Sequence, residues 1–282
     1  MTNDQRYLDS CYLSCKEITK QFSTSFSLGI FCLDKSIRKY IYAVYGLVRV
    51  GDEIVDTFFD INQAQELDQF ERQTYIAIEN HFSSNVVLHA FQDVVNRFKI
   101  DEELIRAFFN SMRMDLNEKS YDESSYKKYI YGSAEVVGLI CLYIFINGDQ
   151  KKYSELEMSA RKLGSAFQKV NFLRDIHEDF NGKGRSYFPN ISLDQKLGEN
   201  QKELIIKDID SDFFSSIAGM KKLPKSSRFG VLLAFKYYKV LLEKISRVPA
   251  EHLSNVRIRV SNAKKIILLL STFSSEKLKI KS

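Results

Sequence analysis

Apolar residues recur along most of the chain at intervals of three and four, and strict alternation of apolar and polar positions is nearly absent. Intervals of three and four gather apolar side chains on one stripe of an α-helix, whereas alternation indicates a strand. The pattern therefore predicts an all-α protein. The helices that it predicts are Asn3–Gln21, Ser36–Phe59, Asn62–Phe82, Val86–Phe98, Asp101–Glu118, Tyr126–Asn147, Lys151–Phe180, Asp194–Met220, Ser226–Arg247 and Ile258–Phe273.

Residues that break helices are scarce. Three of the 282 residues are proline, none of them before Pro189, and 12 are glycine. Two of those glycines fall within Asn181–Pro189, which the composition therefore predicts to be a loop. No repeat, low-complexity tract or linker divides the sequence, so we expect one α-helical domain over residues 1–282.

Charge is unevenly distributed along the chain. The whole sequence has 41 Lys and Arg against 36 Asp and Glu, a net charge of +5, but Met220–Ser282 alone has 15 cationic and 3 acidic residues. A basic segment of this kind suits diphosphates, an anionic lipid surface or nucleic acid, and it equally suits an ordinary solvated helix face. Charge alone leaves these alternatives open.

We expect a cytoplasmic protein, soluble or peripheral at the membrane. The N-terminus lacks the basic and apolar segments of a signal peptide, and the longest apolar run, Leu139–Ile146, is far too short to span a bilayer. Peripheral contact would use Lys264 and Lys265 beside the apolar stretch Ile266–Leu270. Free thiols of a reducing compartment are the plain interpretation of the four cysteines, Cys11, Cys15, Cys32 and Cys141.

The first candidate site is an aspartate pair. Asp52 and Asp56, here called the first aspartate motif, are four residues apart and so lie on one face of a helix. Mg²⁺ takes oxygen ligands and shares them with substrate phosphates, so paired carboxylates suit it. A single pair of this kind is more often an exposed acidic face.

A second pair strengthens the metal interpretation. Asp175 and Asp179, the second aspartate motif, repeat the spacing, and Asn171 extends the same polar stripe with Gln168 close to it. Such a stripe in an apolar helix needs partners, because buried carboxylates are unfavourable unless paired or bound to metal. Two motifs on separate helices can face each other and hold several Mg²⁺ ions around diphosphates. Arg185 follows in the predicted loop, where its guanidinium can bind phosphate oxygens.

Five segments, which together extend over nearly the whole chain, have the spelling of one known family: Ser23–Phe26, Tyr42–Asp56, Tyr131–Gly138, Asn171–Asp175 and Gly184–Pro189. They resemble the squalene/phytoene synthase family. The spellings YGSAEVVGL and AFQKVNFLRD are most similar to the bacterial phytoene synthases within that family. Two positions depart from the family pattern: Glu135 stands where a small residue is common, and Phe22 where a histidine is common.

The resemblance implies a single-domain all-α prenyl synthase (isoprenoid synthase) fold around a central cavity. It implies that the catalytic residues Asp52, Asp56, Asp175 and Asp179, with Asn171, bind Mg²⁺, or alternatively Mn²⁺, bridged to substrate diphosphate. Arg49 is expected at the diphosphate, Tyr131 beside the reacting carbons, and Tyr45 and Phe26 on the cavity wall. The full set of residues expected to bind the prenyl diphosphate is Arg49, Tyr45, Phe26, Tyr131, Gln168, Asn171, Arg185, Tyr238 and Arg257.

The implied reaction is head-to-head condensation of two geranylgeranyl diphosphates, through a cyclopropylcarbinyl diphosphate, to phytoene in carotenoid biosynthesis. The alternative within the family is squalene or dehydrosqualene synthesis from farnesyl diphosphate. Head-to-tail prenyl elongation and terpene cyclisation also use aspartate-rich helices, but Gly184–Pro189 and the Asn171–Asp179 spelling disfavour both. A nucleic-acid binder would leave both aspartate motifs unexplained, so no nucleic-acid partner is expected. The sequence carries no signal for an oligomeric state.

Overall fold

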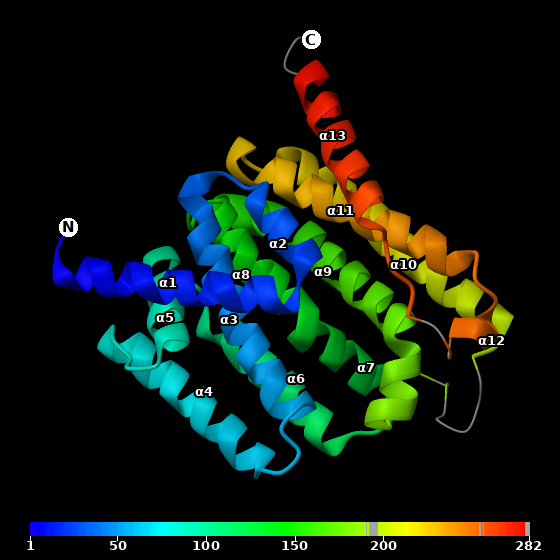
Figure 1. Ribbon diagram of the computed structural model, residues 1–282, viewed down its shortest axis with the longest axis horizontal. Coiled ribbons are helices and arrows are strands. Elements are labelled where there is room, and N and C mark those ends of the chain that lie inside the picture. Colours follow the sequence, from blue (N-terminus) through cyan, green and yellow to red (C-terminus); the bar gives the residue numbers. More distant parts are fainter. Residues whose placement is uncertain (190, 192–196, 254, 256, 280–282) are drawn as a thin grey trace.

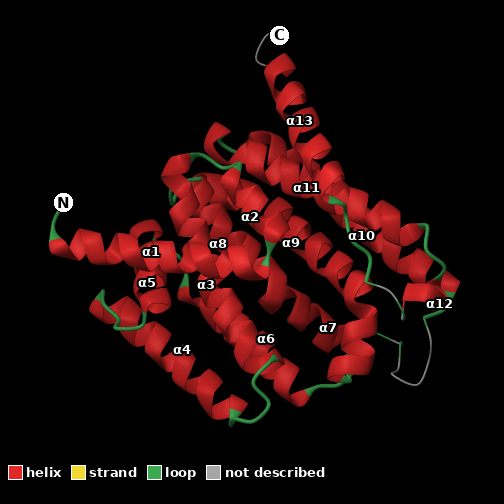
Figure 2. Cartoon of the chain, viewed as in Figure 1, coloured by secondary structure: helices red, strands yellow, loops and turns green. Residues whose placement is uncertain are grey.

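The computed structural model describes residues 1–189, 191, 197–253, 255 and 257–279. In this part of the chain every regular element is a helix, and the only strand-like pairing is an isolated bridge between Ser120 and Ser186 (Figure 2). The predicted all-α fold is confirmed. In chain order the elements are α1 (Asn3–Phe22), α2 (Thr24–Phe31), α3 (Lys35–Asp56), α4 (Gln63–Asn80), α5 (Val86–Phe98), α6 (Glu102–Asn117), α7 (Glu123–Ile130), η1 (Tyr131–Glu135), α8 (Val136–Phe145), α9 (Gln150–Glu178), η2 (Asp179–Lys183), α10 (Glu199–Lys222), α11 (Lys225–Ser246), α12 (Ala250–Leu253) and α13 (Asn262–Lys279).

Short polar side chains begin several of these helices. The carboxylate of Asp34 accepts from the backbone N–H of Ser36 at the start of α3, and Asp101 does the same for α6. Ser23 has two roles: it ends α1, and its hydroxyl accepts from the N–H of Phe26 to begin α2. These bonds satisfy amide groups that a helix start would otherwise leave without a partner. The Ser23 junction turns the chain and brings α2 to the central cavity described below.

The helix predicted over Tyr126–Asn147 is interrupted. The π-helical turn η1 separates α7 from α8, and at Gly132 an added Cβ would lie 2.4 Å from the carbonyl oxygen of Ala107 in α6. Only glycine allows α6 to approach η1 so closely. The combined helix Glu123–Phe145 is long and apolar enough to cross a membrane, but half of its most apolar window is buried inside the protein. It lies among α3, α6 and α9 (Figure 1), so it is a core helix.

Other boundaries differ from the predictions by a few residues. α3 ends at Asp56 instead of Phe59, and α13 begins at Asn262 instead of Ile258. The loop predicted from Asn181 begins later, because the π-helical turn η2 extends α9 to Lys183. The expected start of α10 at Asp194 lies outside the described residues, within which the helix begins at Glu199.

Two large clusters of buried apolar side chains form the core. One is enclosed by α1, α3, α5, α6 and α8, and the other by α7, α9, α10 and α11. The long helix α9 crosses the molecule beside α8 and α10, while α13 packs on α11 and its far end extends beyond the rest of the ribbon (Figure 1). A cavity lies between the two clusters and draws lining residues from both.

Candidate active site

The cavity between the two core clusters has a volume of about 750 Å³ and is long. Its lining follows α9 from Leu156 to Arg174, a length of about 27 Å at a helical rise of roughly 1.5 Å per residue. The α9 side chains at one end are apolar except for Ser159, and those at the other end are Gln168, Asn171 and Arg174. The space therefore suits an elongated molecule with an apolar tail and a polar head.

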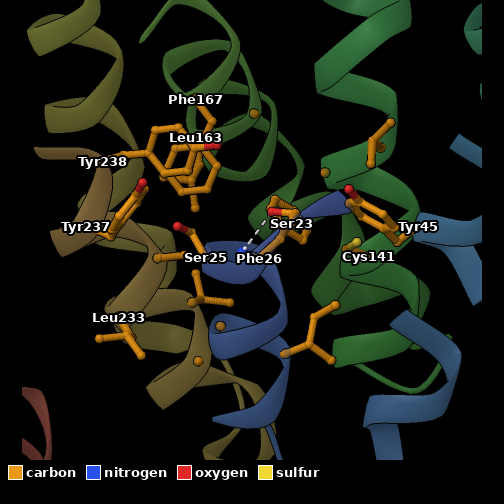
Figure 3. A pocket seen from close by; sticks show the side chains of 18 of the residues that line it. Ser23, Ser25, Phe26, Tyr45, Cys141, Leu163, Phe167, Leu233, Tyr237 and Tyr238 are labelled. Carbon is orange, nitrogen blue, oxygen red and sulfur yellow. Dashed lines mark hydrogen bonds between the residues drawn. The ribbon is translucent and has the colours of Figure 1, made fainter. Parts of the chain in front are cut away.

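Aromatic rings line opposite sides of this cavity. Tyr238 of α11 stacks on Phe167 of α9 with ring centroids 4.1 Å apart, and its hydroxyl donates to Asn171 at 3.3 Å. Tyr45 of α3 lies on the other side, with the ring of Phe26 5.5 Å away (Figure 3). Six residues expected to bind substrate thus line the cavity: Phe26, Tyr45, Gln168, Asn171, Tyr238 and Arg257.

The first aspartate motif lies on α3 just beyond the polar end of the cavity. Val48 lines the cavity, and Asp52 is one helical turn further along. The guanidinium of Arg49 donates to Asp52 at 2.8 Å and also pairs with Glu53. Burial raises the pKa of the Asp52 carboxyl to about 6, and the negative charge of Asp56 adds to the effect.

The second aspartate motif has the same relation to α9. Asn171 lines the cavity and Asp175 follows one turn later, paired with Arg174 and with the Nε of Arg257 at 2.9 Å. Asp179 begins η2. Burial raises the pKa of its carboxyl to about 7; the nearby Lys183 opposes this rise, and the charges of Asp175 and Asp56 reinforce it.

Lys183 brings the two motifs together. Its ammonium group donates to Asp56 of the first motif and lies 3.8 Å from Asp179 of the second. Arg185 also contacts Asp56, at 2.5 Å, and its backbone N–H donates to the carbonyl of Asp179. The structure thus brings the end of the first motif in α3 and the end of the second motif in η2 within reach of one side chain. Lys183 was not among the residues predicted for the site.

A buried carboxylate holds Arg185 in place. Asp115 of α6 lies 3.6 Å from the Arg185 guanidinium and accepts hydrogen bonds from the hydroxyls of Tyr129 and Tyr187, at 2.7 and 2.9 Å. Burial raises the pKa of Asp115 to about 7, although Arg185 opposes that rise. Sequence reasoning missed Asp115 and Tyr129, because nothing in the local sequence of α6 or α7 distinguishes them from ordinary core residues.

Tyr131 lies outside the cavity lining. Its ring packs 5.1 Å from the guanidinium of Arg161, which also binds Glu135 at 2.7 Å. Tyr129, two residues earlier, is connected to the aspartate motifs instead: its hydroxyl donates to Asp115, which holds Arg185 beside Asp56. Glu135, one of the two positions that depart from the family pattern, therefore lies outside the cavity lining. Phe22, the other such position, lines the cavity, and its ring packs 4.2 Å from the Arg49 guanidinium.

The donor atoms fit a hard cation that is shared with a bound anion. In the part of the chain that the structure describes, no three His, Cys, Asp or Glu residues are grouped closely enough to hold a metal by themselves. Mg²⁺ commonly takes one or two carboxylates and completes its coordination with water and substrate phosphates. The four motif carboxylates supply such ligands, and the buried Nε of Arg49 has no hydrogen-bond partner among the described residues. Five cations pair with these carboxylates, and their charge suits phosphate oxygens: Arg49, Arg174, Lys183, Arg185 and Arg257.

An all-α fold around an elongated apolar cavity, with paired aspartates and clustered cations at its polar end, defines the class of helical enzymes that act on prenyl diphosphates. Comparison with protein families identifies the member of that class. The squalene/phytoene synthase family model matches residues 19–264, and the chain belongs to this family of prenyltransferases.

Individual relatives span nearly the whole chain. A phytoene synthase of Arthrospira platensis is 30% identical over 284 residues, covering 92% of this chain and 91% of that protein. The 4,4'-diapophytoene synthase of Staphylococcus haemolyticus (strain JCSC1435) is 24% identical, covering 92% of this chain and 94% of that protein. Among solved structures, a dehydrosqualene synthase in complex with ligand superposes with a TM-score of 0.80 at 25% identity, covering 97% of this chain and 98% of that one.

Proposed function

We propose that this protein condenses two geranylgeranyl diphosphates head to head to phytoene, with Mg²⁺ at the two aspartate motifs. The observation that carries the proposal is the meeting of Asp56 and Asp179 at Lys183, beside the polar end of a 750 Å³ apolar cavity. A prenyl diphosphate has the matching shape, a compact anionic head on a long apolar tail. The similarity to the phytoene synthase of Arthrospira platensis supports the choice of product.

The chain's own residues have three tasks in this reaction. Arg49, Lys183 and Arg185 bind diphosphate oxygens, and the motif carboxylates hold the metal. Mg²⁺, when bound, neutralises diphosphate charge and so makes that group a better leaving group. The apolar wall holds the prenyl tails and excludes water, which would otherwise capture a cation.

Aromatic side chains can stabilise positive charge that develops on the prenyl chain. The faces of aromatic rings attract cations, and the stacked rings of Phe167 and Tyr238 border the polar end of the cavity. Phe26 and Tyr45 lie across from them (Figure 3). The reaction is proposed to run in the cytoplasm, with peripheral contact to a membrane.

The second candidate is squalene or dehydrosqualene synthesis from farnesyl diphosphate. Two similarities favour it: the 4,4'-diapophytoene synthase of Staphylococcus haemolyticus and the dehydrosqualene synthase structure with TM-score 0.80. Both candidates use the same head-group site, and they differ in how much tail the cavity must accommodate.

Product analysis separates the candidates. The purified protein is incubated with Mg²⁺ and either geranylgeranyl or farnesyl diphosphate, and the extracted hydrocarbons are identified by mass. A C40 product from the first substrate supports phytoene synthesis. A C30 product from the second substrate alone transfers the assignment to squalene or dehydrosqualene synthesis, and no product from either contradicts both.

A further inference from the structure

The end of α1 and the start of α2 place two aromatic rings against α3. Phe22 ends α1 and Phe26 follows four residues later in α2, while Tyr45 and Arg49 are four residues apart on α3. The ring of Phe26 lies 5.5 Å from that of Tyr45 (Figure 3), and the ring of Phe22 lies 4.2 Å from the guanidinium of Arg49. Ser23 fixes the junction, because its hydroxyl accepts from the backbone N–H of Phe26 at 3.2 Å. The backbone of Phe22 is therefore held where its ring meets Arg49.

Three contacts hold the guanidinium of Arg49. Its Nη1 donates to Asp52 at 2.8 Å, its Nη2 pairs with Glu53, and its Cζ lies over the ring of Phe22. Cations are attracted to the face of an aromatic ring, and a guanidinium stacks there without using its N–H donors. The buried Nε has no hydrogen-bond partner among the described residues. Arg49 is therefore fixed in orientation and keeps a donor for an anion.

Phe22 also stands between this cation and the apolar space. It lines the cavity, whereas Arg49, which its ring contacts, does not. Phe22 is 52% exposed, so it contributes less to the core than a buried phenylalanine does. It is also one of the two positions at which the chain departs from the family pattern. The contact with Arg49 gives the aromatic ring a role that core packing does not.

We propose that Phe22 is a positioning residue that holds Arg49 for the diphosphate head group. The ring covers one face of the guanidinium, excludes water from that face, and leaves the edge with the free Nε for phosphate oxygens. A charge from which water is excluded attracts an anion more strongly. This inference deepens the proposed function, since it rests on a diphosphate binding at Arg49.

Calorimetry with inorganic diphosphate and Mg²⁺ on the purified full-length protein tests the proposal. Phe22→Leu keeps an apolar side chain and removes the ring, and Phe22→Tyr keeps the ring. The matched control is Phe31→Leu. Phe31, at the end of α2, is 60% exposed, and its ring lies 4.7 Å from the guanidinium of Arg38, away from the aspartate motifs. Both leucine variants thus lose one exposed contact between a phenylalanine and an arginine, and circular dichroism checks that each is folded.

Phe22→Leu should weaken the binding of diphosphate with Mg²⁺ about threefold to tenfold, as expected for the loss of one contact between a cation and an aromatic ring. Phe22→Tyr and Phe31→Leu should bind as the wild type does. In an Arg49→Gln background, Phe22→Leu should have no further effect, because two residues that act through one contact are not additive. A merely structural role would weaken binding equally in both backgrounds.

Unchanged binding by Phe22→Leu would overturn the proposal. An equal loss in Phe22→Tyr, in Phe31→Leu or in the Arg49→Gln background would overturn it too. Wild-type protein that binds no diphosphate with Mg²⁺ would contradict the head-group site of the proposed function as well. The two failures are distinguishable, because the second is seen in the wild type and the first only in the variants.

Discussion

Asp52 and Asp175 each follow a cavity-lining residue by one helical turn, so they are the motif carboxylates closest to the polar end of the cavity. Replacing either by asparagine keeps the size of the side chain and removes its charge. We expect Asp52→Asn and Asp175→Asn each to lower turnover at least about 100-fold, since direct metal ligands should matter at least as much as the residues that orient them. Product formation under saturating Mg²⁺ measures the effect. The exposed Asp60→Asn is the control, and near-normal turnover in both motif variants would refute the metal assignment.

The raised pKa values at the motifs predict how the need for Mg²⁺ changes with pH. Burial holds the pKa of Asp52 at about 6 and that of Asp179 at about 7, so both lose their charge as the pH falls through this range. A metal binds the ionised carboxylate, and protons therefore compete with it. For each carboxyl from which Mg²⁺ must displace a proton, we expect the Mg²⁺ concentration for half-maximal activity to rise about tenfold per pH unit below the pKa of that carboxyl. Mg²⁺ titrations between about pH 8 and about pH 6 test this, and an unchanged requirement contradicts it.

Asp115 should affect both activity and folding. Asp115→Asn removes the charge that faces Arg185, so we expect about tenfold weaker substrate binding as the guanidinium loses its fixed position. The folded protein holds the Asp115 proton more tightly than the unfolded chain does, because burial raises its pKa to about 7. Protonated Asp115 therefore adds to the free energy of unfolding at low pH, and this contribution is lost as the pH rises from about 4 to about 7.

The asparagine variant lacks this loss. The free energy of unfolding of the variant minus that of the wild type, both measured in urea, should rise by on the order of a few kcal/mol between pH 5 and pH 8. A difference between the two proteins that stays constant with pH would contradict the argument, whereas a merely structural role would leave substrate binding unchanged.

At the scale of single residues, the sequence predicts local geometry and misses partners that are distant along the chain. The spacing of Asp52 and Asp56 is visible in the sequence, because four residues make about one helical turn. The partner of Asp56, Lys183, is 127 residues away, and Tyr187 is 72 residues from Asp115. Such contacts depend on how helices pack, so no local pattern indicates them.

The long helices were predictable because each repeats its apolar stripe over several turns. The helix α2 was missed, since it has eight residues and too few turns to show a stripe. The interruption at η1 was also missed. Its π-helical turn is fitted to the surface of α6, and the only local sign is Gly132, one glycine among 12.

Gly132 therefore offers a test of how α6 packs on η1. In Gly132→Ala the new methyl group would lie 2.4 Å from the Ala107 oxygen and 2.7 Å from the Ser111 Cβ, so helices must separate. We expect the free energy of unfolding to fall by about 1–3 kcal/mol, despite the better helix propensity of alanine. The control is Gly29→Ala, where an added Cβ meets no atom within 4 Å. Equal stability of the two variants would show that the close approach is not needed.

At the scale of the whole molecule, the cavity is what the sequence could not show. An unfilled space depends on side chains that fail to meet, and Cys141 and Leu142 look like any other core residues in an apolar run. The fold itself was predictable, because the resemblance to a known family extends over most of the chain.

The size of this cavity should decide which substrate is used. Cys141 lines the wall opposite Tyr237 and Phe167 (Figure 3), and Cys141→Phe would place a ring in that space. We expect turnover of geranylgeranyl diphosphate to fall at least about tenfold and that of farnesyl diphosphate to fall less, since a filled cavity excludes the longer tail first. Mass analysis of competing reactions measures the ratio. Met158→Phe, at a position 61% exposed, is the control, and an equal loss with both substrates would contradict the argument.

Every carboxylate of the two motifs already lies near a cation of the protein, as in Asp56 with Lys183 and Arg185, or Asp175 with Arg174 and Arg257. The site is thus a set of exchangeable ion pairs. A metal ion alone must displace a cation, and a diphosphate alone must draw a cation away from its carboxylate. Under the proposed function, the carboxylates would turn to the metal and the released cations to the diphosphate, so each ligand would make binding of the other more favourable. Metal and diphosphate should therefore load together, and by the reciprocity of coupled binding they should leave together after the chain is joined.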